Sequence, residues 1–247
     1  PRYDLSERLI PEAVALEPLT LEAVRRWHLR RSLHAPGAGT EADLRMYLAY
    51  PHMAVPDRRR TLRAALDTGE VVQVDVEGER APWLALAEDL PALAAAGRKR
   101  RPSAGTTLLS PFDSFLWHRD RVLRLFGYEY KLEVYTPGPS RRHGYYSMPI
   151  LHEGRLVGRL DPKLHRAEGR LEVRNVHFEP WFAKDEAPPL ARRALDRDAV
   201  LGGIGEALWS LAAFVGADEV TLGRVAPTAL APALRRALRL VQGAGGD

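Results

Sequence analysis

A basic stretch interrupts the apolar pattern of the chain at residues 97–107. Four consecutive basic residues are followed there by a proline and a step rich in Ser, Gly and Thr, a composition typical of linkers. The stretch divides 247 residues, 45% of them hydrophobic, into two parts that are each long enough to bury a core. We therefore expect folded domains at 20–96 and 108–247, preceded by a connector at 1–19.

The composition excludes several classes of site. The chain has no cysteine, so it forms no disulfide, no thiolate metal site and no thiol nucleophile. Its eight histidines lack the spacing of metal ligands, and we expect neither a metal nor another cofactor. No run of about 18 apolar residues and no signal segment occur, so we expect a cytoplasmic protein without membrane contact. We also expect a monomer.

Positive charge is concentrated in one part of the sequence. The formal net charge is +4, but residues 97–145 contain ten basic and four acidic side chains. The rest of the chain therefore carries a small negative excess, and the stretch 97–145 is electropositive. Such a stretch favours a polyanionic partner.

Three helical patterns and a strand pair fill residues 20–96. The helices are expected after Thr20, after Thr40 and from Pro56 to Gly69, with both threonines as N-caps. Strands are expected at 72–76 and 83–86. This order is typical of a winged helix-turn-helix module, whose third helix can enter a DNA major groove. On the first helix we expect one inward face, formed by Leu21, Val24, Trp27 and Leu33.

The second part of the sequence predicts an antiparallel sheet with flanking helices. We expect a helix at 112–126 and a long helical region at about 187–215, followed by a short strand at 220–222 and a last helix at 228–240. Four further strands are expected at 129–135, 144–151, 155–163 and 169–178. The fold class is therefore α+β, with a winged helix-turn-helix module followed by an antiparallel β-sheet domain.

The candidate DNA-binding residues are basic side chains with one tyrosine. The third helix offers arginine forks that fit phosphates and guanine edges, although a solvated helix face or a protein contact would look the same. The linker cluster could follow a phosphate backbone or could be solvated. A predicted hairpin tip near residue 141 combines charge with aromatic faces, although tips are often only polar. The candidates are Arg58, Arg59, Arg63, Arg98, Lys99, Arg100, Arg101, Arg119, Arg141, Arg142 and Tyr145.

Candidate catalytic residues are few. Asp113 precedes an apolar helix, where its carboxylate is expected to act as a cap, although it could instead activate a water. We interpret His118 as an ordinary surface histidine. Gln73-Val74-Asp75 could orient a water, but alternating outward polar residues on a strand explain the pattern more simply. The catalytic residues are therefore unknown from the sequence, and Gln73, Asp75 and Asp113 are weak candidates.

An ordered series of short runs extends through the second part of the chain. The runs are Leu108-Leu109-Ser110-Pro111-Phe112-Asp113, Leu116-Trp117, Arg119, Arg121, Leu125-Phe126-Gly127, Tyr130, Leu132-Glu133-Val134-Tyr135, Arg141-Arg142, Gly144-Tyr145-Tyr146 and Leu156-Val157-Gly158-Arg159-Leu160-Asp161-Pro162-Lys163. With the preceding winged-helix pattern, the series resembles the YcaQ/AlkZ-type winged-helix DNA glycosylases over most of residues 2–180.

This resemblance implies tandem winged helices and a C-terminal sheet domain shaped around duplex DNA. It implies hydrolysis of the N-glycosidic bond of alkylated or crosslinked purines in nucleoid DNA. The family's Gln-x-Gln or Gln-x-Asp element belongs to an N-terminal winged helix, and a strand expected at residues 2–5 resembles the end of that module. We therefore expect the catalytic motif upstream of this sequence. The alternative is a winged-helix transcriptional or architectural protein without chemistry.

Overall fold

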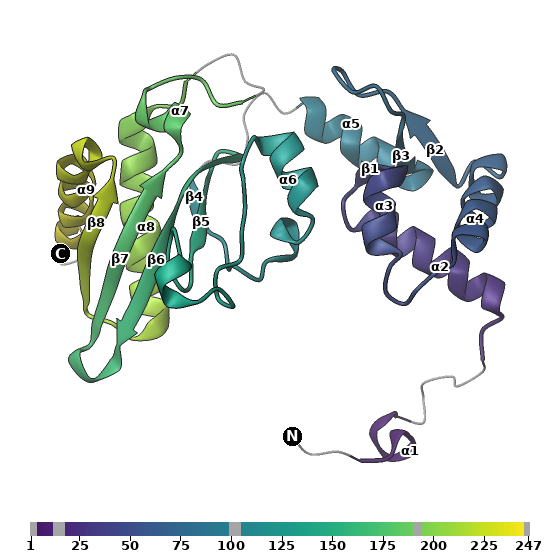
Figure 1. Cartoon of the computed structure of the whole chain (residues 1–247), viewed down its shortest axis with the longest axis horizontal. Coiled ribbons are helices and arrows are strands. Elements are labelled where there is room, and N and C mark those ends of the chain that lie inside the picture. Colours follow the sequence, from purple (N-terminus) through teal and green to yellow (C-terminus); the bar gives the residue numbers. More distant parts are fainter. Residues whose placement is uncertain (1–3, 12–17, 99–104, 190–193, 245–247) are drawn as a thin grey trace. The chain divides into compact units, whose positions relative to one another are not determined.

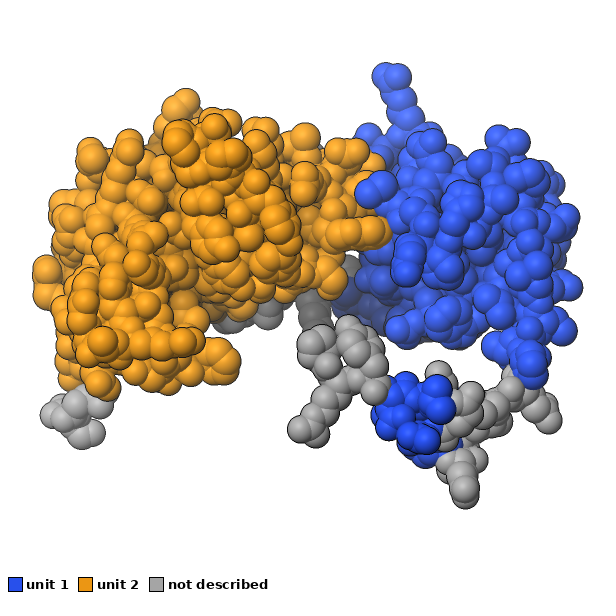
Figure 2. All heavy atoms as spheres, turned by 60° about the horizontal axis from the view of Figure 1, so that its bottom comes forward, with its two compact units in different colours: residues 1–98 blue, residues 99–247 orange. Residues whose placement is uncertain are grey.

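The structure is a computed structural model of the whole chain, and it describes residues 4–11, 18–98, 105–189 and 194–244 (Figure 1). The chain forms two compact units, which comprise residues 1–98 and 99–247 (Figure 2). Each unit has its own hydrophobic core and is described by itself.

Unit 1 consists of helices packed against a small sheet. Its strands form a three-stranded antiparallel sheet in the order β1-β3-β2. Its elements are α1 (Ser6–Leu9), α2 (Leu21–His34), β1 (Ala38–Thr40), α3 (Glu41–Tyr47), α4 (Val55–Asp67), β2 (Val71–Val74), β3 (Trp83–Leu86), the 3-10 turn η1 (Ala87–Asp89) and α5 (Leu90–Arg98).

Local sequence signals account for the first residues of α2, α3 and α4. The Thr20 hydroxyl accepts a hydrogen bond from the backbone N–H of Ala23 at 3.2 Å, as predicted for an N-cap. Thr40 and Asp43 form a capping box at the start of α3. Pro56 lies in the first turn of α4, where its fixed φ suits the helix. The predicted caps and the three helices are confirmed.

The predicted inward face of α2 is right for Leu33 and wrong for Leu21 and Trp27, while Val24 is half-buried. Leu21 and Trp27 are 62% and 54% exposed, whereas Leu29 and Leu33 lie in the core with α3, α4 and the sheet. The buried stripe is defined by the C-terminal half of the helix, where both leucines pack, and Trp27 falls outside it. Strand β1 was not predicted because a Pro-Gly-Ala-Gly sequence resembles a chain break, yet Gly39 pairs with Leu84.

Unit 2 is a five-stranded sheet covered by helices, in the strand order β4-β5-β6-β7-β8. The core between the sheet and α8 includes Ile150, Leu160, Ile204 and Leu208. The elements are β4 (Thr106–Leu108), η2 (Ser114–Leu116), α6 (Arg119–Phe126), η3 (Gly138–Ser140), β5 (Met148–His152), β6 (Arg155–His165), η4 (Arg166–Glu168), β7 (Arg170–Phe178), α7 (Pro180–Ala183), α8 (Arg197–Val215), β8 (Glu219–Ala226), η5 (Thr228–Leu230) and α9 (Ala231–Ala244).

The sheet is mixed, which corrects the prediction of a purely antiparallel one. The pairings from β4 to β7 are antiparallel, but β8 pairs with β7 in parallel. The long helix α8 connects β7 to β8 and carries the chain back to the end of the sheet from which β7 starts, as a parallel pairing requires. By length and composition alone, α8 is also a candidate membrane span, but its Val200, Ile204 and Leu208 side chains are buried in unit 2.

Three predicted elements of unit 2 differ from the structure. The helical region expected at about 187–215 is a helix only from Arg197, because residues 187–189 and 194–196 are not helical and 190–193 lie outside the described residues. Residues 129–135 form no strand, and the edge position beside β5 belongs to β4. Apolar residues in this segment are buried for another reason, because Tyr128 and Tyr130 pack into a small core with Leu116 and Val122. The helix predicted at 112–126 begins only at Arg119, after the turn η2.

The strand predicted near the beginning of the chain is not observed. Of residues 2–5, Arg2 and Tyr3 lie outside the described residues, and Asp4 and Leu5 precede the short helix α1 without strand pairing. The Asp4 carboxylate accepts a hydrogen bond from the backbone N–H of Leu5 at 2.8 Å. Such local capping bonds favour a turn over an extended strand.

Candidate nucleic-acid interface

One face of α4 presents arginines to solvent. Leu62 and Ala65 anchor the helix in the core of unit 1, and Arg59 and Arg63 are exposed on another side. Residues four apart lie on the same helix face, so the two guanidinium groups are neighbours. In the part of the chain that the structure describes, neither forms an ion pair. We call Arg59 and Arg63 the open arginine face.

Arg58 does not belong to this face. Its side chain is half-buried, and its Nε atom is buried with no hydrogen-bond partner among the residues described. A helix rotates about 100° per residue, so Arg58 points away from the side that Arg59 and Arg63 share. The structure thus brings together two of the three arginines that the sequence singled out on this helix.

A shallow hollow joins the open arginine face to strand β2. It has a volume of about 530 Å³, and its lining includes Arg63, Asp67 and Gln73. Gln73 is exposed on β2, and the exposed Asp75 follows the end of the strand. The hollow therefore places one weak catalytic candidate beside a cationic side chain, but no buried polar group orients the amide for catalysis.

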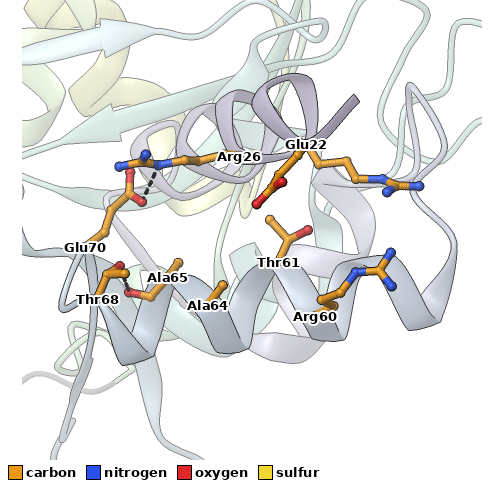
Figure 3. Close-up of a pocket in the computed structure, with 9 residues that line it drawn as sticks. Glu22, Arg26, Arg60, Thr61, Ala64, Ala65, Thr68 and Glu70 are labelled. Atoms are coloured by element: carbon orange, nitrogen blue, oxygen red, sulfur yellow. Dashed lines mark hydrogen bonds and ion pairs between the residues drawn. The ribbon is translucent and has the colours of Figure 1, made fainter. Parts of the chain in front are cut away.

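The opposite side of α4 forms a groove with α2 (Figure 3). This groove has a volume of about 430 Å³, and small side chains such as Thr61 and Ala64 line it. Here the arginines are paired: Arg25 and Arg60 both bond the Asp57 carboxylate. The arginines of this groove are therefore already engaged by a carboxylate.

A second carboxylate continues this pairing along α2. Glu70 accepts hydrogen bonds from Arg26 at 2.7 Å and from Arg30 at 2.6 Å, and Arg30 also bonds Glu88 at 2.7 Å. Burial raises the pKa of Glu70, but the bonds from Arg30 and Arg26 outweigh it and hold that pKa below its ordinary value. Glu70 is therefore ionised at neutral pH and fixes both arginines.

The basic cluster at 98–101 lies at the boundary between the units. Arg98 is the last residue of α5. The other three candidates lie outside the described residues, and they are Lys99, Arg100 and Arg101.

Asp113 has the capping role that the sequence predicted. Its carboxylate accepts a hydrogen bond from the backbone N–H of Phe115 at 2.8 Å and so starts the turn η2. The nearby Tyr130 hydroxyl donates to the carbonyl of Pro111 at 2.7 Å and ties this segment to the core of unit 2. A carboxylate used as a cap is a poor candidate for activating a water.

His118 is not a surface histidine, as the sequence had suggested. It is 6% exposed, and its Nδ1 atom accepts a hydrogen bond from the backbone N–H of Arg121 at 3.3 Å. The ring therefore caps α6 from a buried position. The next residue, Arg119, is exposed at the first position of that helix.

The segment before β5 is an irregular loop, not the tip of a hairpin. Because residues 129–135 form no strand, Arg141 and Arg142 have no hairpin to cap. The loop is instead organised by Glu133, a buried carboxylate that accepts backbone N–H bonds from Arg142, His143 and Gly144 at 3.0, 2.8 and 3.1 Å.

The side chains of this loop differ in their exposure. The guanidinium carbon of Arg141 lies 4.8 Å from the ring centroid of Tyr145, and its Nε donates to the carbonyl of Thr136 at 2.9 Å. Arg142 is exposed, and Tyr145 is 49% exposed. Three of the candidate residues are therefore gathered in one short loop of unit 2.

A buried polar cluster beneath the loop was not predicted. Arg159 is 6% exposed, bonds Glu179 at 2.8 Å, and lies 4.2 Å from the ring centroid of Tyr128. Burial, followed by the positive charge of Arg159, lowers the pKa of His143 to about 4. The available signal was a charged residue within an apolar run, Val157-Gly158-Arg159-Leu160.

No cluster of three or more potential metal ligands occurs in the ranges that the structure describes.

The comparison with known families is decisive for these two units. Residues 1–201 match the family described as DNA glycosylase AlkZ-like. The chain belongs to the AlkZ-like DNA glycosylase family. The match includes unit 1 and unit 2 up to the first residues of α8, and it confirms the resemblance found in the sequence.

AlkZ-like proteins are glycosylases that act on DNA, so family membership implies a DNA substrate and a role in DNA repair. The open arginine face and the loop before β5 both lie within the matched residues. No solved structure was found to match the chain.

Proposed function

We propose that this protein is a winged-helix DNA-repair glycosylase that binds duplex DNA and hydrolyses the N-glycosidic bond of alkylated or crosslinked purines. The observation that carries the proposal is the open arginine face, where Arg59 and Arg63 form no ion pair with any residue that the structure describes, while Arg25 and Arg60 on the other side of the helix share a carboxylate. Unpaired guanidinium groups on an exposed helix are suited to phosphates and guanine edges.

The element order of unit 1 supports a winged helix-turn-helix module. The elements follow one another as α2-β1-α3-α4-β2-β3, and an eight-residue turn, residues 75–82, joins β2 to β3. In such modules the third helix enters a groove and the wing contacts the backbone. We therefore assign DNA recognition to α4.

The proposed reaction needs little from the protein beyond placement. An alkylated purine carries a positive charge, so it is already a good leaving group. Water adds to C1′ of the sugar while the C1′–N bond breaks, and the purine leaves with the electron pair as a neutral base. The water loses one proton to a base or to solvent and keeps the other in the new C1′ hydroxyl. The protein has to position the water and stabilise positive charge on the sugar.

We assign this placement to the Gln-x-Gln or Gln-x-Asp element of an upstream winged-helix module, in line with the family resemblance. Gln73 and Asp75 are the alternative within this chain, and of the two only Gln73 lines the hollow at β2 with Arg63. Asp113 is set aside because its carboxylate is engaged in a cap. Activity on chromosomal DNA would place the protein in the cytoplasm with the nucleoid.

The test is release of free base from a duplex that contains N7-methylguanine. The assay uses this chain and the complete gene product, with mass spectrometry for the free base and a separate count of abasic sites. We expect salt-sensitive duplex binding by this chain, and stoichiometric base and abasic site from the complete product. Gln73→Ala with Asp75→Ala distinguishes the two assignments, because it abolishes release only if these residues carry the chemistry.

Two results would overturn the proposal. Tight duplex binding without base release by the complete product would favour a transcriptional or architectural DNA-binding protein. Indifference to DNA even at low salt would favour a protein-contact module.

A further inference from the structure

Tyr145 and Arg141 form an exposed aromatic and cationic pair in the loop of residues 136–145. The guanidinium carbon lies 4.8 Å from the ring centroid, and the tyrosine side chain remains 49% exposed. A large aromatic ring with this exposure can still stack on a further planar group.

The loop that carries this pair is held rigidly. The Glu133 carboxylate accepts three successive backbone N–H bonds, and Asp161 accepts the backbone N–H of Tyr146 at 2.8 Å. Gly144 has φ +139°, and a Cβ atom there would overlap the Asp161 side chain. A binding loop that is ordered before its ligand arrives loses little entropy on binding.

Arg141 is poorly suited to a phosphate. Its Nε already donates to the carbonyl of Thr136 at 2.9 Å, and its guanidinium carbon lies over the Tyr145 ring. A bidentate phosphate contact needs a free edge of the guanidinium fork. Arg142, by contrast, is exposed and forms no ion pair within the residues that the structure covers. The loop therefore combines a stacking surface with a separate free cation.

A second exposed aromatic ring lies close to this surface. Phe112 is 55% exposed, and its ring centroid lies 6.3 Å from that of Tyr146, the neighbour of Tyr145 in sequence. The Tyr146 hydroxyl lies 3.4 Å from the Ser110 hydroxyl, which keeps the two segments together. Exposed aromatic rings near cationic side chains are typical of proteins that stack unpaired bases, and the Tyr145–Arg141 pair has this composition.

We propose that Tyr145, backed by Arg141, is a stacking site for a DNA base that has left the helical stack, with Arg142 on a neighbouring phosphate. The inference rests on the proposed function and deepens it, because it names an unpaired nucleotide as the ligand of this loop. A paired duplex cannot use the site, because both faces of each base are covered by its neighbours.

The experiment compares two DNA ligands by fluorescence anisotropy: a fully paired 20-base-pair duplex, and the same duplex with one unpaired adenine. We expect the unmodified chain to bind the bulged duplex about 5-fold or more tightly than the paired one, the size of one base–aromatic stack. Tyr145→Leu keeps an apolar side chain without an aromatic face, and we expect it to abolish that preference while binding to the paired duplex stays within about 2-fold. Tyr145→Phe is the matched control and should retain the preference.

A third variant separates stacking from charge. Arg142→Ala should weaken binding to both ligands by the same factor, so the preference ratio is unchanged. As a second readout, 2-aminopurine at the bulge should lose fluorescence on binding to the unmodified chain and to Tyr145→Phe, but not on binding to Tyr145→Leu.

Equal affinity of the unmodified chain for the two duplexes would overturn the stacking site and leave the proposed function intact. The same conclusion follows if Tyr145→Leu retains the preference. Failure to bind either duplex at low salt would overturn the proposed function itself, so the two failures are distinguishable.

Discussion

The two solvent-facing sides of α4 use arginine in opposite ways. On the side of α2, Arg25 and Arg60 share the Asp57 carboxylate, whereas Arg59 and Arg63 on the open arginine face pair with no carboxylate among the described residues. Each side presents two arginines, although Arg25 comes from α2. The difference indicates that the number of arginines alone does not make a binding surface. What matters is whether the fold places a carboxylate beside each arginine, because a paired arginine is less available to DNA.

The same contrast recurs in unit 2, where it has the largest expected effect on stability. Arg159 is buried against Glu179 and Tyr128, so Arg159→Ala leaves a buried carboxylate unpaired and should lower the free energy of unfolding by about 3 kcal/mol. The exposed Arg142→Ala should change it by less than about 0.5 kcal/mol. Urea unfolding followed by tryptophan fluorescence measures both. Equal stability of the two variants would break the comparison.

Removal of the open arginine face should have the largest effect on DNA binding. Arg59→Ala with Arg63→Ala removes two charge-assisted contacts, each worth about a factor of ten, so affinity for a duplex at low salt should fall about 100-fold. The matched control is Arg25→Ala with Arg60→Ala, which changes the net charge by the same amount and should weaken binding less than about 3-fold. The measurement is fluorescence anisotropy. A similar loss in both double variants would mean that only net charge matters.

Removal of the Glu70 carboxylate tests the same comparison between paired and unpaired arginines. Its carboxylate is mostly buried and bonds both Arg26 and Arg30, so Glu70→Ala should cost unit 1 about 1–2 kcal/mol, measured as a fall in the midpoint of thermal unfolding. Because these arginines lie away from the open arginine face, duplex affinity should change by less than about 2-fold. A large gain in affinity would show that the paired arginines can bind DNA once they are released.

The smallest expected effect is the pH dependence of unit 2. The pKa of His143 in the folded protein is about 4, below its ordinary 6.5, so the unfolded chain binds more protons between these values. Burial raises the pKa of Glu133, but three backbone N–H bonds outweigh it and hold that pKa below its ordinary 4.5. Both groups therefore stabilise the fold at neutral pH. Their contributions decline as the pH falls, first through the His143 window and then below pH 4.5.

This prediction is checked by the midpoint of thermal unfolding at pH 7, 6, 5 and 4, which should decrease at each step. His143→Phe keeps a ring beside His177 and should make the profile shallower between pH 6.5 and 4. Burial also lowers the pKa of His152 and of His177, so part of the slope should remain. A profile for His143→Phe as steep as that of the unmodified chain would show that other groups carry the acid sensitivity.

Local signals made part of the fold predictable from the sequence. Thr20 and Thr40 cap their helices, Asp113 caps its turn, and the strands near 71–74 and 83–86 follow from alternation and a glycine turn. Each of these features depends on residues a few positions apart. The wrong strand at 129–135 had the same alternation, but its tyrosines are buried in a side core.

Long-range pairing could not be read from the sequence. Arg25 meets Asp57 across 32 positions, Arg30 meets Glu70 across 40, and Arg159 meets Glu179 across 20. Whether an arginine is exposed and available or engaged by other residues depends on such long-range contacts. The sequence therefore marked Arg58 and Arg63 alike, although Arg58 is half-buried and Arg63 is exposed. The parallel position of β8 has a similar origin, because it depends on the path of α8 across the sheet.

The most direct test of the account is the salt dependence of duplex binding. Affinity is measured from 50 to 300 mM salt for the unmodified chain, for Arg59→Ala with Arg63→Ala, and for Arg25→Ala with Arg60→Ala. The account predicts that the logarithmic slope becomes shallower by about two in the first variant and is unchanged in the second. Equal slopes in all three proteins, or no duplex binding at 50 mM salt, would contradict it.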